Sequence, residues 1–204
     1  LTLWIGFHQF WRRTHGDVQP EEPILRDTGT LANRDAVLDS TGSKRDPTRD
    51  RQDPTPRLVH PVTGEKVPDP SRKLEYRTIL DPRETEWPPA EFIIGNPPFM
   101  GQFRQREAFG DGYVDALRAA YPKVPDTADL VIYWWYKAAR EVAEGRTIRA
   151  GFITTQSITQ KQNREVIVGA EANGARVVWA IADHYWNDGS DDARVRVAMT
   201  VIAK

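Results

Sequence analysis

Residues Phe92-Ile93-Ile94-Gly95-Asn96-Pro97-Pro98-Phe99 join a short apolar run directly to two consecutive prolines. The run at residues 91–95 predicts a buried parallel strand, because a strand covered on both faces is apolar throughout. The prolines fix the backbone, remove two amide donors and restrict the residue before them. We therefore expect Asn96 to be held in a stiff frame with its amide side chain projecting, beside the flat face of Phe99.

This loop offers two acceptors and an aromatic ring to a ligand. The carbonyl groups of Asn96 and Pro97 can both face outward without a partner, and Phe99 lies next to them. A planar amine such as the exocyclic amino group of adenine fits, because two hydrogen bonds from its protons favour a more nucleophilic, tetrahedral nitrogen. A base in a duplex must leave the helix to reach such a loop. The alternative interpretation is a rigid turn with no ligand.

The elements around this strand alternate between strand and helix. Apolar periodicity predicts helices at residues 1–13, 112–121, 126–144 and 160–172, and strands at 29–38, 148–155, 175–182 and 194–203. This order favours an α/β domain with a central, mostly parallel sheet flanked by helices. The last two strands have no helix between them, so one of them is expected to be antiparallel. Ligands of such sheets bind at the carboxyl ends of the strands, where the Asn96 loop follows.

Residues 39–89 differ in composition from the rest of the chain. They contain nine of the chain's 15 prolines among many charged residues. Such a composition buries little apolar surface, so we interpret the segment as an insertion loop within a single domain at residues 1–204. Within it, residues 58–60 and 66–67 flank Thr63-Gly64 and predict a small hairpin.

The bulk properties exclude some classes of protein. The chain has 204 residues, 0 cysteines and a formal net charge of −1. Disulfides and zinc–thiolate sites are therefore excluded, and no metal is implied. No apolar run is long enough to span a bilayer and no signal peptide is visible, so a cytoplasmic protein is expected. The charge argues against a dedicated nucleic-acid module that grips a duplex alone.

Several segments resemble a known family. Phe92–Phe99 resembles motif IV of the amino-methyltransferases, which have a Rossmann-like, S-adenosylmethionine-binding fold. The whole chain resembles the MmeI-type adenine-specific methyltransferases of type IIG restriction–modification systems. The segments that carry this resemblance are Trp4–Trp11, Arg34–Leu38, Phe92–Phe99, Gly112–Leu117, Ala128–Ala138 and Ala150–Ile158.

The resemblance implies transfer of a methyl group from S-adenosyl-L-methionine to the N6 amino group of a flipped adenine in double-stranded DNA. The residues that it implies for catalysis are Asn96, Pro97, Pro98 and Phe99. For the cofactor it implies Asp35 and Ala36, which resemble part of motif III. The candidates for contact with the DNA substrate are Gln102, Arg104, His184 and Tyr185.

The sequence also departs from the family pattern. The family's glycine-rich cofactor loop and its acidic ribose-binding residue lie upstream of the first helix and are not found here. We therefore expect a C-terminal part of a class I methyltransferase domain, without its first cofactor-binding strands, that is inactive without the N-terminal part. The alternatives are an amino-methyltransferase acting on RNA or protein glutamine, and a non-catalytic fragment or scaffold.

Some candidate residues have structural interpretations as well. Asp35 equally suits a turn aspartate, and Asp129 is predicted to cap the helix at 126–144. Gln102, Arg104 and Arg106 equally suit a solvated loop. The four aromatic residues at 133–136 cannot all face one way on a helix, so most are predicted to be core. Residues 187–192 suit a solvated turn better than a calcium loop.

Overall fold

The computed structural model describes residues 2–16, 18, 20, 31–55, 57–185 and 196–204, with side chains from residue 6 onward. The chain divides into two units, Leu1–Arg34 and Asp35–Lys204. In the first unit, helix α1 spans Thr2–His15 as predicted. Gly16 ends this helix with a φ of +65°, and its amide donates to the Arg12 carbonyl at 3.1 Å. A left-handed residue after the last turn is the usual helix stop, which explains the glycine.

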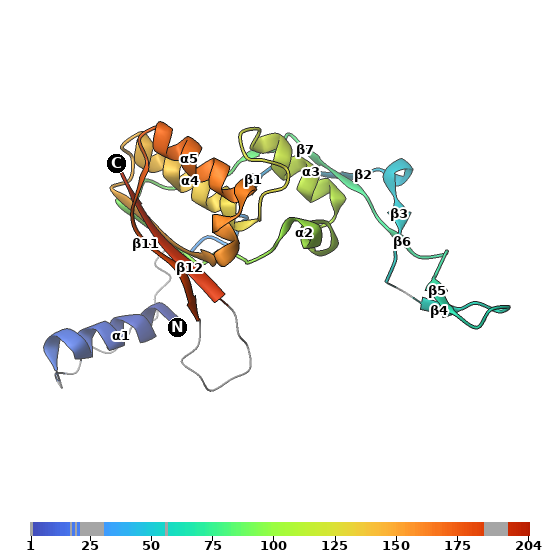
Figure 1. The fold of residues 1–204 in the computed structure, drawn as a ribbon, viewed down its shortest axis with the longest axis horizontal. Coiled ribbons are helices and arrows are strands. Elements are labelled where there is room, and N and C mark those ends of the chain that lie inside the picture. Colours follow the sequence, from blue (N-terminus) through green and yellow to red (C-terminus); the bar gives the residue numbers. More distant parts are fainter. Residues whose placement is uncertain (1, 17, 19, 21–30, 56, 186–195) are drawn as a thin grey trace. The chain divides into compact units, whose positions relative to one another are not determined.

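A four-stranded sheet lies in the second unit, in the order β11-β12-β10-β9 (Figure 1). Its strands are β9 (Phe92–Gly95), β10 (Arg149–Thr155), β11 (Arg176–Tyr185) and β12 (Arg196–Ala203). β9 pairs parallel with β10, whereas β12 is antiparallel to both β10 and β11. Strands β9, β10 and β11 therefore run in one direction, and the prediction that one of the last two strands is antiparallel is confirmed.

The prediction of a mostly parallel sheet is wrong for the paired strands. Only the β9–β10 pairing is parallel in this sheet, and the four two-stranded sheets of the described chain are all antiparallel. Only residues 186–195 separate β11 from β12, which is too short for the crossover that a parallel neighbour needs. Because β12 also inserts between β11 and β10, it makes both of its pairings antiparallel.

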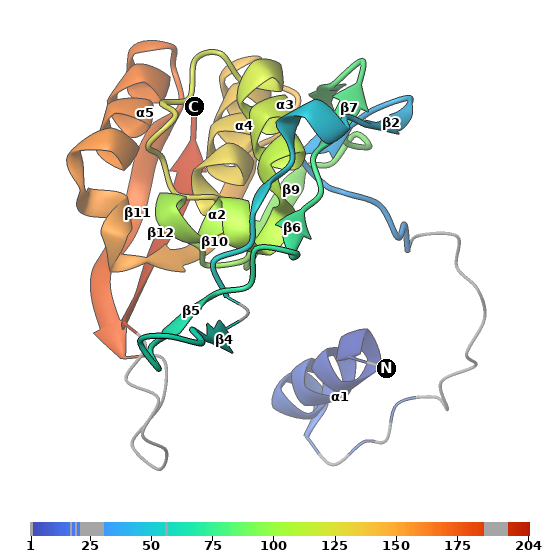
Figure 2. The ribbon, with the colours of Figure 1, turned by 90° about the vertical axis from the view of Figure 1, so that its right-hand side faces the viewer.

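Helices α4 (Val131–Ala143) and α5 (Lys161–Ala172) lie side by side on one face of this sheet (Figures 1 and 2). Trp135 of α4 is fully buried, and its indole nitrogen donates to the Thr200 hydroxyl of β12 at 3.1 Å. The sheet contributes Ala150, Phe152 and Ile202 to the same core. Each large apolar side chain buried here stabilises the fold by roughly 1.5–3 kcal/mol.

The predicted helices in this unit are confirmed, and one helix was not predicted. α3 (Asp111–Ala120) and α5 match their predicted ranges closely. α4 begins later than predicted, because residues 126–130 form turns. The helix that was not predicted is α2 (Gln102–Phe109), and a short 3₁₀ helix, η2 (Gln156–Thr159), follows β10.

The opposite face of the sheet is apolar and open in the described part of this unit. Phe92 is 57% exposed, Ile94 is 89% exposed and Trp179 is 49% exposed. Alternate residues of a strand point to opposite faces, and only Ile93 of β9 packs partly against the core. The prediction that β9 is buried on both faces is therefore wrong, because β9 is an edge strand with helices on one side only.

The Pro-rich segment is paired rather than irregular. Its strands are β1 (Leu38–Asp39), β2 (Gly42–Arg45), β3 (Arg51–Gln52), β4 (Arg57–Val59), β5 (Lys66–Pro68), β6 (Lys73–Leu74), β7 (Arg77–Leu80) and β8 (Arg83–Glu84), with the 3₁₀ turn η1 (Pro47–Arg49) between β2 and β3. β1 pairs with β8, β2 with β7, β3 with β6 and β4 with β5. The predicted small hairpin is confirmed at β4–β5, and the nested pairs extend it into a long hairpin. Only Leu38 of the strand predicted at 29–38 lies in a described strand.

Candidate active site

The Asn96 loop leaves the carboxyl end of β9. Gly95 lies against the Phe152 ring, where an added β-carbon would be 2.8 Å from a ring carbon, so only glycine fits. Asn96 and Pro98 are exposed, Phe99 is half-buried and Pro97 is buried. No described residue makes a hydrogen bond with the Asn96 side chain or with the backbone oxygen of Asn96 or Pro97. These acceptors therefore have no partner among the described residues.

The far end of the loop is held by backbone contacts. The Met100 carbonyl accepts from the Leu130 amide at 2.9 Å, at the start of α4. The buried Gln105 side chain of α2 donates to the Ala128 carbonyl at 3.0 Å. The loop is thus fixed between β9 and the helix that packs on the sheet, which gives Asn96–Phe99 a defined position.

Two pockets border the loop, one along β9 and one at the carboxyl end of β10. The first has a volume of about 510 Å³. Its lining includes Ala36, Trp87, Asn96, Pro97, Pro98 and Trp134. The second has a volume of about 330 Å³. Its lining includes Phe99, Gln102, Asp129, Ser157, Gln160 and Gln162. The structure therefore brings the predicted residue Ala36 to Asn96, and Gln102 to Phe99.

Asp35 holds a turn in the described structure. One carboxylate oxygen accepts from the amides of Val37 and Leu38 at 2.8 and 3.0 Å, and the other accepts from the Tyr113 hydroxyl at 2.6 Å. Burial, with this hydrogen bond to Asp35, raises the pKa of Tyr113 well above its usual value. The adjacent Ala36 carbonyl accepts from the Trp87 indole at 2.6 Å. These contacts fix the wall of the first pocket.

Asp129 does not cap α4, contrary to prediction. Leu130 occupies the cap position, without a side-chain hydrogen bond. The Asp129 carboxylate instead accepts through Oδ2 from the Ser157 hydroxyl and, at 2.9 Å, from the Asn163 amide. Asn163 in return accepts from the Asp129 backbone amide at 3.0 Å. Sequence reasoning missed Ser157 and Asn163, because an aspartate before a helix has the same local pattern whether or not it caps.

The two arginines of α2 differ, because Arg106 forms ion pairs with described residues and Arg104 does not. Arg104 is exposed, and its guanidinium makes no hydrogen bond or ion pair with the described residues. Arg106 pairs with Asp111 at 3.2 Å and with Asp115 at 2.8 Å. Arg106 is therefore a structural residue rather than a free contact, whereas Arg104 remains a candidate.

His184 and Tyr185 lie at the end of β11, on the sheet edge opposite to β9. Neither lines the two pockets at the Asn96 loop. The Arg196 guanidinium lies 4.9 Å from the centre of the Tyr185 ring. Contact of His184 and Tyr185 with the substrate stays a prediction. Residues 187–192, predicted to form a solvated turn, lie outside the described residues.

The aromatic run of α4 is mostly core, as predicted. Tyr133 and Trp135 are fully buried. Trp134 is half-buried and faces the first pocket together with Trp87. The sequence did not single out these two tryptophans, because a flat wall formed by residues so far apart in the chain depends on how β9 and α4 pack.

The described residues form neither a metal site nor a membrane-spanning helix. No group of three or more His, Asp or Glu side chains there is placed to hold a metal ion. Among the described helices, none combines the length and apolar character that crossing a membrane requires.

Comparison with known proteins adds the family. The sequence model of the MmeI DNA-methyltransferase domain matches residues 51–204, which include the Asn96 loop. The chain belongs to this family. A solved structure of the type IIL restriction-modification enzyme MmeI in complex with DNA is 29% identical, with a TM-score of 0.45. That match covers 54% of this chain and 15% of the MmeI chain, so the sequence spans a small share of that protein. No curated protein matches the chain.

Proposed function

We propose that this MmeI-family domain forms the base-holding side of a DNA methyltransferase that methylates the N6 amino group of adenine. The observation that carries the proposal is the Asn96 loop between two pockets, in which Asn96 is exposed and its oxygens and that of Pro97 accept no hydrogen bond from the described residues. Methyl transfer needs in-line approach of donor and acceptor more than it needs an acid–base pair. A loop bordered by two pockets suits such a reaction.

The second pocket, which Phe99 lines, suits the ring of a flipped adenine whose amino group points toward Asn96 and Pro97 at the border with the first pocket. The Asn96 side-chain oxygen and the Pro97 backbone oxygen would accept the two protons of its amino group, and Phe99 would stack on the base. Stacking contributes roughly 1–3 kcal/mol, comparable to the few kcal/mol that extrusion of a base costs. Gln102 lines this pocket beside Phe99, and Arg104, two residues later in the first turn of α2, would contact a phosphate.

The first pocket suits part of S-adenosylmethionine, which supplies the methyl group as an electrophile. Trp87, Trp134 and Ala36 give it flat and apolar walls. None of its described lining residues is charged, so nothing there pairs with the cofactor's carboxylate or ammonium group. We therefore expect weak binding by the isolated chain, and micromolar affinity by calorimetry would contradict this. Asp35 would act by fixing Ala36, and any contact of its own would share an oxygen already in use.

The sheet supports a Rossmann-like, class I methyltransferase arrangement. Three strands run in one direction and β12 inserts against them. The Asn96 loop and η2 follow the two paired parallel strands at the same edge, where such folds bind ligands. Family membership favours a role of the complete protein in restriction–modification.

The test is a substrate comparison with S-[methyl-³H]adenosylmethionine, made with this domain joined to the N-terminal part that would supply the expected cofactor loop. Duplex DNA, single-stranded DNA, RNA and a glutamine peptide are offered separately, and labelled nucleosides are identified by mass spectrometry. We expect N6-methyladenine from DNA, with faster transfer to single strands because no base pair must be opened. Label in cytosine, RNA or glutamine but not in DNA adenine would overturn the proposal.

A further inference from the structure

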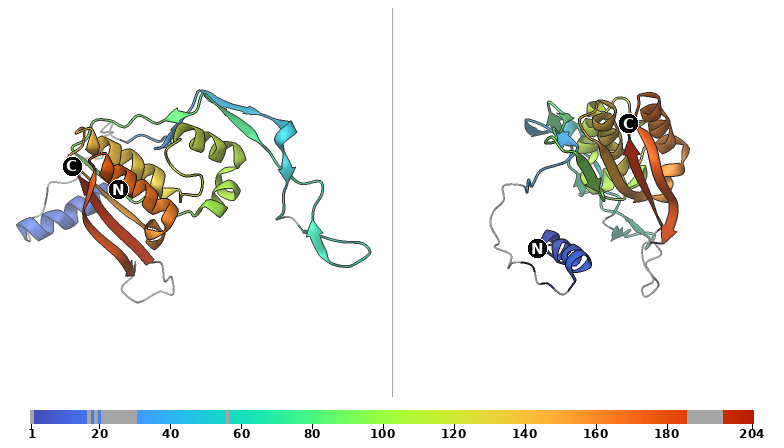
Figure 3. Two further views of the ribbon diagram at one scale, coloured as in Figure 1. Left: turned by 45° about the horizontal axis from the view of Figure 1, so that its top comes forward. Right: turned by 90° about the vertical axis from the view of Figure 1, so that its left-hand side faces the viewer.

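The hairpin arm, defined here as residues 42–80, extends away from the four-stranded sheet (Figures 1 and 3). Three nested antiparallel pairs, β2–β7, β3–β6 and β4–β5, build it as one two-stranded ribbon. An isolated ribbon of this kind is marginally stable in water. Something outside the ribbon must therefore hold it.

Ion pairs hold the arm to α3. Arg49 pairs with Asp115 at 2.9 Å, and Arg51 pairs with Asp111. Tyr76 donates its hydroxyl to Asp115 at 2.9 Å and lies under the Arg49 guanidinium, 3.7 Å from it. Arg106 of α2 pairs with the same two aspartates. The arm is thus joined directly to α3 and, through Asp111 and Asp115, to α2, the helix that follows the Asn96 loop.

Backbone packing fixes the arm at a second point. A β-carbon on Gly112 would overlap the backbone oxygen of Arg77 and lie 2.8 Å from its carbonyl carbon. Strand β7 therefore lies directly on α3, and only glycine permits that approach. Since α3 also contacts α2, the position of the arm is set relative to the loop rather than left to a flexible hinge.

The arm is positively charged in a chain that is not. The arm contains nine Lys and Arg residues and six Asp and Glu residues, which give it a net charge of +3. The whole chain has a net charge of −1, so the residues outside the arm have a net charge of −4. Asp46, Asp53 and Asp69 turn inward to bond the hydroxyl and amide groups two residues later. Six cations of the arm make no ion pair with a described carboxylate, and we call them the free cations: Lys44, Arg57, Lys66, Arg72, Lys73 and Arg77.

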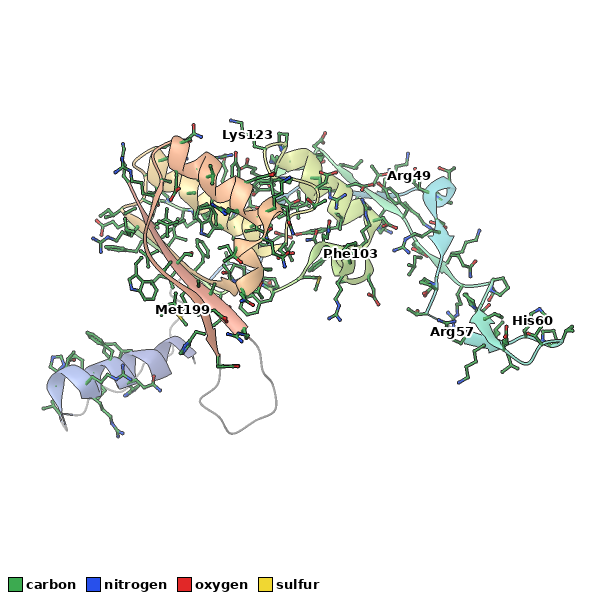
Figure 4. All side chains as sticks on the ribbon, viewed as in Figure 1. Arg49, Arg57, His60, Phe103, Lys123 and Met199 are labelled. Atoms are coloured by element: carbon green, nitrogen blue, oxygen red, sulfur yellow. The ribbon has the colours of Figure 1, made fainter. Side chains whose placement is uncertain are left out.

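The tip of the arm combines two of the free cations, Arg57 and Lys66, with apolar side chains. Arg57 and Lys66 share one face of the β4–β5 pair, whose register sets Arg57 opposite Pro68 and Val59 opposite Lys66. Beyond them, Val62 is 85% exposed and Pro61 is exposed. Figure 4 places Arg57 and His60 at the far end of the arm, with Arg49 between them and α3.

We propose that the hairpin arm binds duplex DNA, with its free cations on phosphates and its tip in a groove. A two-stranded ribbon fits the major groove, and apolar tips of architectural proteins enter the minor groove. The inference rests on the proposed function in one respect, that the substrate is DNA. A carboxylate-rich protein is the other partner that such charge would suit, but the exposed cations follow both strands, as a polyanion with regular phosphates requires.

The test is the salt dependence of binding. A fluorescein-labelled, mixed-sequence duplex is titrated with the chain by anisotropy at several NaCl concentrations. The arm variant is Arg57→Gln with Lys66→Gln. The control variant is Lys123→Gln with Arg164→Gln, which removes the same charge from two exposed cations outside the arm and without ion pairs to described residues. We expect the slope of log K against log[NaCl] to fall by about two in the arm variant, and to stay unchanged in the control.

Three results would overturn the proposal. The first is that the unaltered chain shows no salt-dependent binding to the duplex. The second is an equal decrease of the salt slope in the arm variant and the control variant. The third is that the arm variant changes only the self-association of the chain in sedimentation, which would indicate a protein partner. The Asn96→Ala variant separates this proposal from the catalytic one, because it should keep the salt slope while methyl transfer is lost. In the domain completed by its N-terminal part, normal DNA binding with no adenine methylation would therefore contradict the proposed function alone.

Discussion

The base of the hairpin arm and the Asn96 loop use polar groups in opposite ways. At the base, Arg49, Arg51 and Arg106 are paired with Asp111 and Asp115. In the loop, the Asn96 side chain and the Pro97 backbone oxygen make no hydrogen bond with the described residues. Paired groups hold elements together, whereas unpaired groups can bind a ligand, so chemistry is expected at the loop rather than at the base of the arm.

Solvent exposure explains why both arrangements are stable. Asp111 keeps 17% and Asp115 33% of its side chain exposed, so each charge needs a partner to offset lost hydration. Asn96 is exposed and its polar atoms can be hydrated, so leaving them without protein partners costs little. The loop can therefore be rigid although its polar groups have no hydrogen-bond partners among the described residues, because prolines and backbone contacts fix it.

The largest effect is expected for Asn96→Ala, which tests whether unpaired groups in the loop act only in catalysis. It should lower the rate of methyl transfer by about 100- to 1000-fold, as loss of one transition-state hydrogen bond does in other enzymes. The midpoint of thermal unfolding should hardly change. The contrasting control is Asn173→Ala, an exposed asparagine at the end of α5 whose side-chain amide is paired, since it donates to the Gly169 carbonyl at 2.6 Å. A large loss of stability in Asn96→Ala would contradict the comparison.

The next effect is expected for Gly112→Ala, which attacks the base of the arm. The added β-carbon overlaps the backbone of Arg77, so the arm or α3 must shift. We expect a loss of about 1–3 kcal/mol in the free energy of unfolding, measured in urea. In the control Gly169→Ala, the new methyl group meets no atom within 4 Å inside α5 and should be slightly stabilising. Equal effects of the two substitutions would show that the arm is not packed on α3.

Local pattern predicted most of the elements around the loop. The apolar spacing of α4 and α5 and the apolar run of β10 were sufficient, because these residues alternate between core and solvent as their periods require. The consecutive prolines predicted the stiff loop with exposed Asn96, because they act through bonded geometry. What the pattern did not give was strand direction, since the place of β12 between β10 and β11 is a property of the whole sheet.

The arm and the Asp129 cluster were not predictable in the same way. Arg49 and Asp115 are 66 residues apart, so neither residue's neighbours indicate the pair. The composition of residues 39–89 indicated an irregular insertion, because it contains little to bury; the ribbon is held instead by charges on α3. Asp129 and Asn163 are 34 residues apart and meet only when α5 packs on α4.

A smaller effect is expected for Asp129→Asn. Asp129 is intermediate between the base of the arm and the Asn96 loop, because only one of its two carboxylate oxygens is paired with described residues. One carboxylate oxygen is paired with Ser157 and Asn163, while the other makes no hydrogen bond with described residues and lies near Gly101 in the second pocket. Loss of the charge-assisted bonds should cost about 1–2 kcal/mol of stability. The exposed Asp126→Asn is the control, since its side chain is 72% exposed. If Asp129→Asn left stability unchanged but impaired methylation, Asp129 would belong with the catalytic loop.

The smallest effect is a pH dependence at the base of the arm. Burial raises the pKa of Asp115, but hydrogen bonds from Arg106, Tyr76 and Arg49 outweigh it and hold the pKa below the usual aspartate value. A carboxyl group with a lower pKa in the folded state stabilises the fold above its unfolded pKa of about 3.9, and this contribution is lost as pH falls through the folded pKa.

Asp115→Asn should therefore lower the free energy of unfolding by on the order of 1 kcal/mol at neutral pH, within the range of partly exposed ion pairs. The difference between the two proteins should shrink as the pH falls below about 4, because the native carboxylate then becomes protonated as well. Urea unfolding at a series of pH values measures both curves. A constant difference across this range would mean that Asp115 acts through the shape of its contacts rather than its charge, and the base of the arm would then resemble the loop more than we infer.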